Sequence, residues 1–130
     1  MQNTKTLIEA RMKLYFDGLY HSDTERLGQV FAPGACYVCA TGGEVINLGL
    51  DEYFPIVDRR EPPAARGEPR RDEIVSIIMA GDRAALVVAR CAIGERHFTD
   101  LLSFIDTAAG WRIIAKVFHY DLIPAPQPQE

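Results

Sequence analysis

The sequence has no basic stripe, no long apolar run and few cysteines, and each absence excludes a class of protein. Its formal net charge is -4, whereas a protein that binds nucleic-acid phosphates normally carries a positive surface. No segment approaches the ~18 apolar residues of a membrane span. The opening stretch MQNTKTLIEARMK lacks the apolar core that a signal peptide needs. We therefore expect a cytoplasmic protein that binds neither nucleic acid nor membrane.

The cysteines do not form a recognisable site. Three cysteines are too few for a disulfide scaffold and cannot all pair within one chain. Cys36 and Cys39 match C-x-x-C, but redox proteins place this pattern at a helix N-terminus, and here it lies in a predicted strand. The pattern therefore favours small core residues. No zinc-ligand spacing and no G-x-G-x-x-G, P-loop or G-x-S-x-G motif is present, so we expect no metal and no cofactor.

What remains is the composition of one ordinary globular domain. The chain has 130 residues, of which 48% are hydrophobic and 25% charged. Helical spacing of apolar residues predicts a first helix over 5–20, and a capping box at Ser22–Glu25 predicts a short second helix. The segment LDEYFPIVDRR predicts a third helix over 50–60. Pro55 should confine it mostly to the residues after the proline, or kink it.

Strands dominate the second half of the sequence. The proline-rich segment 61–71 is a loop, either a solvated connector or a lid, and the Pro/Gln-rich tail 124–130 is predicted to be disordered. Helices followed by strands in hairpins predict one α+β domain over 1–123, with N-terminal helices packed on an antiparallel sheet. The predicted strands span 35–40, 45–48, 72–80, 83–93, 96–106 and 111–122.

Asp100 stands in the middle of an otherwise apolar stripe. Strand alternation places it on one face with Phe98, Leu102 and Phe104. Three interpretations stay open: a hydrogen bond to a core tyrosine, a polar group in a ligand cavity, or a solvated carboxylate in a different register. Burial disfavours the charged form of a carboxyl group, so a neutral Asp100 could donate a hydrogen bond to a carbonyl or oxyanion.

The register of the last two strands determines the neighbour of Asp100. If the TAAG turn pairs Asp106 with Trp111, strict alternation brings Val117 and His119 to the face of Asp100. Asp100 and His119 would then be diagonal neighbours, roughly 7–8 Å apart at the backbone, and could form an acid–base pair. A one-residue slip would bury two basic residues, Arg112 and Lys116, which burial disfavours.

The opposite face of the same two strands is too apolar for open solvent. A second subunit would cover such a face, so we expect a homodimer. The side chains predicted at this interface are Leu101, Ile105, Ile114 and Phe118.

Two long segments of the chain resemble a known family. They are YFDGLYHSDTERLGQVFAPGA, starting at Tyr15, and FTDLLSFIDTAAGWRIIAKVFH, starting at Phe98. Both are similar to the putative lumazine-binding family of the nuclear transport factor 2-like superfamily. The resemblance implies a cystatin-like cone, in which helices and a curved sheet enclose a pocket, and dimerisation through the sheet.

Ketosteroid isomerases of the same superfamily share two spacings with this chain. Their first-helix tyrosine matches Tyr15, eight residues before Asp23, and their oxyanion-binding aspartate matches Asp100, four residues before a phenylalanine. The resemblance implies that Tyr15 and Asp100 hold a carbonyl or hydroxyl group. The general-base aspartate of those enzymes falls on Cys39, so their proton shuttle is missing unless His119 replaces it.

Three functions stay open on these grounds. The favoured one is binding of a small, largely apolar molecule that carries a carbonyl or hydroxyl group. The alternatives are an isomerase, dehydratase or cyclase with Asp100, His119 and Tyr15 as catalytic candidates, and a dimeric interaction module without a ligand. The predicted ligand-binding residues are Tyr15, Leu19, Cys39, Phe54, Phe98, Asp100, Leu102, Val117 and His119.

Overall fold

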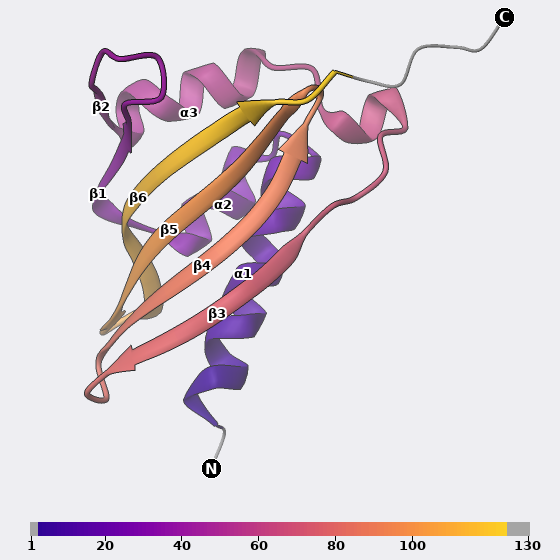
Figure 1. Cartoon of the computed structure of the whole chain (residues 1–130). Coiled ribbons are helices and arrows are strands. Elements are labelled where there is room, and N and C mark those ends of the chain that lie inside the picture. Colours follow the sequence, from indigo (N-terminus) through magenta and orange to yellow (C-terminus); the bar gives the residue numbers. More distant parts are fainter. Residues whose placement is uncertain (1–2, 125–130) are drawn as a thin grey trace, which may run out of the picture.

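The computed structural model describes residues 3–124 and has the predicted α+β architecture. Helices pack on one face of a six-stranded sheet that curves around them (Figure 1). Apart from Pro124, the predicted tail lies outside the described residues. The elements are α1 (Thr4–Tyr20), α2 (Thr24–Val30), β1 (Phe31–Cys39), β2 (Ile46–Gly49), α3 (Leu50–Arg59), η1 (Pro63–Arg66), β3 (Glu73–Ala80), β4 (Ala84–Ile93), β5 (Arg96–Thr107) and β6 (Gly110–Leu122).

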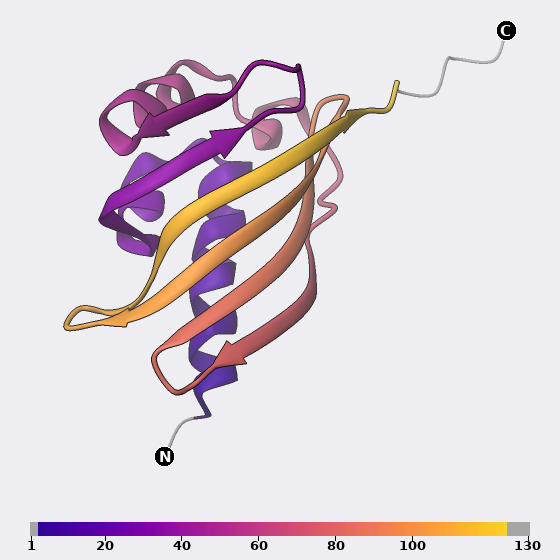
Figure 2. The same ribbon diagram turned by 60° about the vertical axis from the view of Figure 1, so that its left-hand side comes forward.

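The strands follow the order β2-β1-β6-β5-β4-β3. The hairpins β3–β4, β4–β5 and β5–β6 are antiparallel as predicted, but β1 and β6 are parallel, an arrangement that the long connection between them allows. Figure 2 shows the sheet wrapped around α1, which runs behind its centre. Among the described residues, no helix is long and apolar enough to cross a membrane.

Three details of the helices differ from the prediction. The short 3-10 helix η1 lies inside segment 61–71, which was predicted as a loop. Asp23, rather than Ser22, caps α2, because its carboxylate accepts hydrogen bonds from the N–H groups of Glu25 and Arg26. The third helix begins at Leu50, ahead of Pro55 instead of after it. Its first turn contains two acidic residues, which stabilise the positive end of a helix.

The β5–β6 hairpin contains a bulge that the sequence did not predict. The turn pairs Asp106 with Trp111 and Phe104 with Ile113, as expected, but Ser103 then pairs with Ala115. Ile114 is therefore an extra residue in β6. Because side chains alternate along a strand, every β6 residue after Ile114 changes face relative to the straight register.

The bulge reverses the predicted positions of four β6 side chains. Lys116 and Phe118 lie on the inner face and are only 4% and 7% exposed, whereas Val117 and His119 lie on the outer face. A slipped register along the whole of β6 would bury Arg112 and Lys116 together. The bulge separates them, because Arg112 precedes it and remains partly exposed.

Candidate functional site

The polar centre of the cone is a hydrogen bond between α1 and β5. The Tyr15 hydroxyl donates to Asp100 Oδ2 at 2.6 Å, and both side chains are wholly buried. This contact is the first of the three interpretations left open for Asp100, a hydrogen bond to a core tyrosine. Asp100 Oδ1 is also buried but has no hydrogen-bond partner among residues 3–124. Such an unpaired acceptor costs about 1–3 kcal/mol, which a ligand that donates a hydrogen bond would recover.

Lys116 takes the place beside Asp100 that the straight register gave to His119. Asp100 pairs with Phe118 across the β5–β6 ladder, so Lys116, two residues earlier, is its diagonal neighbour on the inner face. The Lys116 ammonium lies over four aromatic rings, a cation–π arrangement that stabilises a buried positive charge. The distances from Nζ to the ring centroids are 5.2 Å for Tyr15, 5.4 Å for Tyr37, 5.5 Å for Tyr53 and 5.2 Å for Phe118.

Three elements bring these rings together. Tyr15 comes from α1, Tyr37 from β1 and Tyr53 from α3, and the last two stack with their centroids 4.1 Å apart. Phe118 comes from β6 and lies 4.7 Å from Tyr37. We call Asp100, Lys116 and these four aromatic residues the interior site.

Burial and charge determine the protonation of this site. Burial acts to lower the pKa of Lys116, but the neighbouring Tyr53 and Asp100 outweigh it and raise the pKa, so the ammonium stays charged at neutral pH. Burial, followed by the charge of Asp100, raises the pKa of Tyr15 well above its usual value. The Tyr15 hydroxyl therefore keeps its proton and serves as a donor. Burial, followed by Asp100, also raises the pKa of the nearby Cys91 thiol to about 12.

The structure brings some of the predicted ligand-binding residues together but not all of them. Besides Tyr15 and Asp100, Leu19, Cys39 and Leu102 are buried, and Phe54 and Phe98 are partly buried against the same core. Val117 and His119 lie across the sheet from them, so the predicted pair of Asp100 and His119 is wrong. Lys116, Tyr37 and Tyr53 were not predicted as residues of the site. One feature of the sequence pointed to Lys116. Side chains two positions apart share a face of a strand, so Lys116 shares a face with the aromatic residues Phe118 and Tyr120, and His119 does not.

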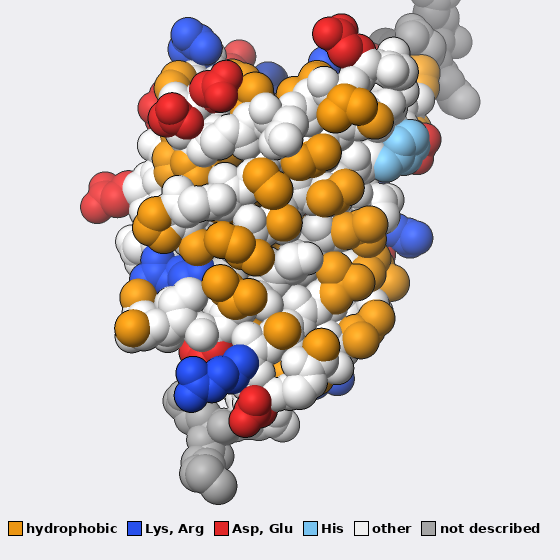
Figure 3. All heavy atoms as spheres, turned by 90° about the vertical axis from the view of Figure 1, so that its left-hand side faces the viewer, with side chains coloured by type: hydrophobic (Ala, Val, Ile, Leu, Met, Phe, Trp, Pro, Cys, Tyr) orange, Lys and Arg blue, Asp and Glu red, His pale blue; other side chains and the backbone are white. Residues whose placement is uncertain are grey.

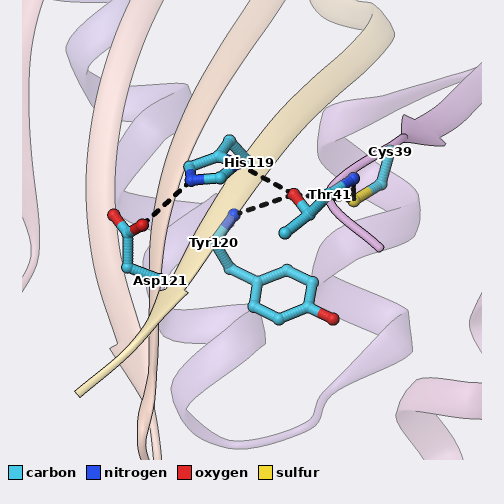
Figure 4. Close-up of polar contacts among 5 residues, drawn as sticks. All are labelled: Cys39, Thr41, His119, Tyr120 and Asp121. Atoms are coloured by element: carbon cyan, nitrogen blue, oxygen red, sulfur yellow. Dashed lines mark hydrogen bonds and ion pairs between the residues drawn. The ribbon is translucent and has the colours of Figure 1, made fainter. Parts of the chain in front are cut away.

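His119 belongs to a separate network at the surface (Figure 4). Its Nδ1 lies 3.0 Å from Thr41 Oγ1, and its Nε2 lies 3.0 Å from Asp121 Oδ1. Thr41 also accepts a hydrogen bond from the Tyr120 N–H group and contacts Cys39 Sγ at 3.4 Å. These bonds join the turn after β1 to the end of β6. They leave Cys39, which matches the isomerase base position, engaged with Thr41.

The interior site is filled by protein side chains. Five cavities with volumes from about 320 to about 540 Å³ open on the surface of the described residues, and neither Tyr15 nor Asp100 lines any of these five. One of them, of about 370 Å³, is lined by Phe98. Because Phe98 contacts Phe118, with ring centroids 5.8 Å apart, this cavity borders the interior site.

Comparison with known proteins decides the family. The family model described as putative lumazine-binding matches residues 3–119, which is most of the chain. The chain belongs to this family. Comparison with curated proteins gives no match.

Solved structures similar to this family member share its fold. A nuclear transport factor 2-like protein of unknown function from Silicibacter pomeroyi has a TM-score of 0.81 at 19% identity and covers 93% of this chain and 100% of its own. One from Shewanella baltica has a TM-score of 0.80 at 18% identity, covering 90% and 93%. A ketosteroid isomerase-like protein from Erwinia carotovora atroseptica has a TM-score of 0.71 at 14% identity, covering 92% and 98%. The nuclear transport factor 2-like fold is therefore confirmed.

Proposed function

We propose that the protein binds a small planar molecule in the interior site, between the sheet and the helices. Asp100 Oδ1 accepts a hydrogen bond from an N–H or hydroxyl group of the ligand, and the Lys116 ammonium donates to a carbonyl group. The observation that carries this proposal is the buried, unpaired Asp100 Oδ1 on the diagonal from a buried lysine. Both groups gain free energy from a polar partner.

The chemistry of the site suits a flat heterocycle. The rings of Tyr37 and Tyr53 stack on each other, with an interplanar angle of 21° and centroids 4.1 Å apart, and a planar ligand could extend such a stack. Lumazine, which the family description names, is a flat ring system with adjacent carbonyl and N–H groups. Its carbonyl would meet the Lys116 ammonium and its N–H would meet Asp100. The bound ring would displace aromatic side chains that now fill the site.

A lumazine titration followed by fluorescence tests this function. We expect the wild type to bind, and Asp100→Asn to weaken binding by about tenfold, because a charge-assisted hydrogen bond is replaced by a neutral one. Asp106→Asn, on the same strand but outside the site, is the matched control and should bind like the wild type. Circular dichroism verifies that each variant is folded. Absence of binding by the wild type, or equal affinities of the two variants, would refute the proposal.

We also propose that the outer face of the sheet pairs with a second copy of the chain. Phe118 does not belong to this interface, because the bulge buries it against Tyr37 and Phe98. Val117 takes its place and is 42% exposed, as is Leu101, with which it pairs across the ladder. Figure 3 shows hydrophobic side chains gathered over the centre of this face and charged ones mostly at its edges.

The oligomeric state tests the proposed dimer. We expect sedimentation velocity to give a dimer for the wild type at micromolar concentration and a monomer for Leu101→Glu, because a charge buried in an apolar interface is unfavourable. Leu7→Glu changes an exposed leucine on α1 and should leave the dimer intact. A monomeric wild type would overturn this part of the proposal.

Cys36, Cys39 and Cys91 are all free thiols, and we keep the cytoplasm as the proposed location.

A further inference from the structure

The cavity that borders the interior site opens beside η1 and the end of α3. It has a volume of about 370 Å³ and lies where the end of α3, η1 and the tips of β4–β6 converge, near the end of the described chain in Figure 1. We call it the mouth cavity. Its lining residues are Arg60, Arg66, Ile93, Gly94, Glu95, Arg96, Phe98 and Leu122.

Positive charge predominates around the mouth cavity, in a chain that is acidic overall. Three arginines line it against a single glutamate, while the whole chain has a net charge of -4. Arg66 is already paired, because its Nε lies 2.6 Å from Glu68 Oε2. Neither Arg60 nor Arg96 forms an ion pair with another residue of the range 3–124. Two guanidinium groups are therefore free to bind an anion.

Arg96 is linked to the interior site by contacts between aromatic rings, and Arg60 by its charge. The Arg96 guanidinium lies over the Tyr120 ring at 4.9 Å, and Tyr120 contacts Phe98 with a centroid distance of 5.9 Å. Arg60 acts on the interior through its charge. Burial raises the pKa of Tyr37 and of Cys91, and the positive charge of Arg60 opposes that rise at both residues. Lys116 opposes the same rise more strongly than Arg60 does, so the two positive charges act on Tyr37 and Cys91 in the same sense.

Two aromatic rings in contact with each other connect the mouth cavity to the Lys116 ammonium. Phe98 lines the cavity, its ring lies 5.8 Å from that of Phe118, and Lys116 Nζ lies 5.2 Å from the Phe118 ring. A planar molecule that displaces these two rings would reach Lys116 with one edge. Its other edge would remain between Arg60 and Arg96.

We propose that the ligand is an anion, a planar heterocycle with a carboxylate substituent. Arg60 and Arg96 bind the carboxylate at the mouth cavity. The opposite edge of the ring, with its carbonyl and N–H groups, reaches Lys116 and Asp100. This inference rests on the proposed function and specifies its ligand class. Arginine suits the task because its planar guanidinium presents paired donors that match a carboxylate. Two such groups at the entrance also attract anions before they bind.

Three matched probes test the charge of the ligand: lumazine, lumazine-6-carboxamide and lumazine-6-carboxylate. We expect the carboxylate to bind at least tenfold more tightly than the carboxamide, which has the same shape without the charge. Higher salt should reduce this difference, because screening weakens exposed charge interactions. In Arg60→Gln and Arg96→Gln the advantage of the carboxylate should fall to threefold or less. Arg59→Gln, on an exposed neighbour that does not line the mouth cavity, should retain it.

The outcomes separate this inference from the function on which it rests. If lumazine and its carboxylate bind equally tightly, the interior site binds a ligand but the anion inference is wrong. The same conclusion follows if the advantage of the carboxylate survives in both Arg60→Gln and Arg96→Gln. If none of the three probes binds the wild type, the proposed function itself fails, and the anion inference fails with it.

Discussion

Asp100→Asn should lower the free energy of unfolding by about 1–2 kcal/mol, because it weakens the buried hydrogen bond from Tyr15 and removes a negative charge that acts on the Lys116 ammonium without forming an ion pair with it. Lys116 is only 4% exposed, so solvent screens the loss of this negative charge poorly. Its aromatic neighbours hold the ammonium by cation–π contacts but cannot neutralise it. The hydrogen bond from Tyr15 changes from charge-assisted to neutral in the same variant.

The double variant Asp100→Asn/Lys116→Met separates this coupling from other effects of the substitution. Methionine keeps the unbranched stem of lysine without its charge, so the double variant should regain most of the lost stability. Urea unfolding of the wild type, both single variants and the double variant gives the interaction free energy. Asp106→Asn should stay within about 0.5 kcal/mol of the wild type. If the two single effects simply add, Asp100 and Lys116 do not interact.

Lys116→Met should weaken lumazine binding by tenfold or more, whereas His119→Gln should not change it. The ammonium is the donor that meets the ligand carbonyl in the proposed complex, and a charged hydrogen bond is worth about 1.5–3 kcal/mol. His119 lies on the outer face, with its side chain 58% exposed and bonded to Thr41 and Asp121. The two variants therefore change basic residues that are three positions apart but on opposite faces of the sheet.

Fluorescence titration of both variants, with circular dichroism as a fold check, measures this difference. Lys5→Met, an exposed lysine on α1, is the control for the loss of one positive charge. Equal binding by Lys116→Met and the wild type would show that the ammonium does not contact lumazine. Loss of binding in His119→Gln would instead favour the straight register of β6.

Much of the fold could be predicted because local patterns agree with it. The apolar spacing of 5–20 gives α1 to within one residue, and alternation in β5 places Asp100 on the inner face. The contact between Tyr15 and Asp100 could not be derived from local patterns, since it joins residues 85 positions apart. A hydrogen bond between Asp100 and a core tyrosine was one of three open interpretations of the residues, and the resemblance to ketosteroid isomerases gave Tyr15 only as a second polar group of the same pocket.

The bulge at Ile114 could not be predicted from hydrophobic alternation. Both faces of β6 carry apolar side chains, with Val117 on one and Phe118 on the other. Hydrophobic alternation therefore does not decide which face is buried. The larger Phe118 and Tyr120 gain more by burial than Val117 and His119 do. Burying Lys116 with them is tolerable only because α1, β1 and α3 supply rings around its ammonium. Those contacts join segments that are far apart in the sequence, so no local sequence pattern predicts them.

A crystal structure of the protein with lumazine tests the central claim most directly, because it shows which basic side chain lies beside Asp100 and where the ligand binds. We predict the bulge at Ile114, Lys116 Nζ within hydrogen-bond distance of a lumazine carbonyl, and Asp100 Oδ1 accepting from a lumazine N–H group. A straight β6 with His119 beside Asp100, or lumazine bound outside the cone, would contradict the account.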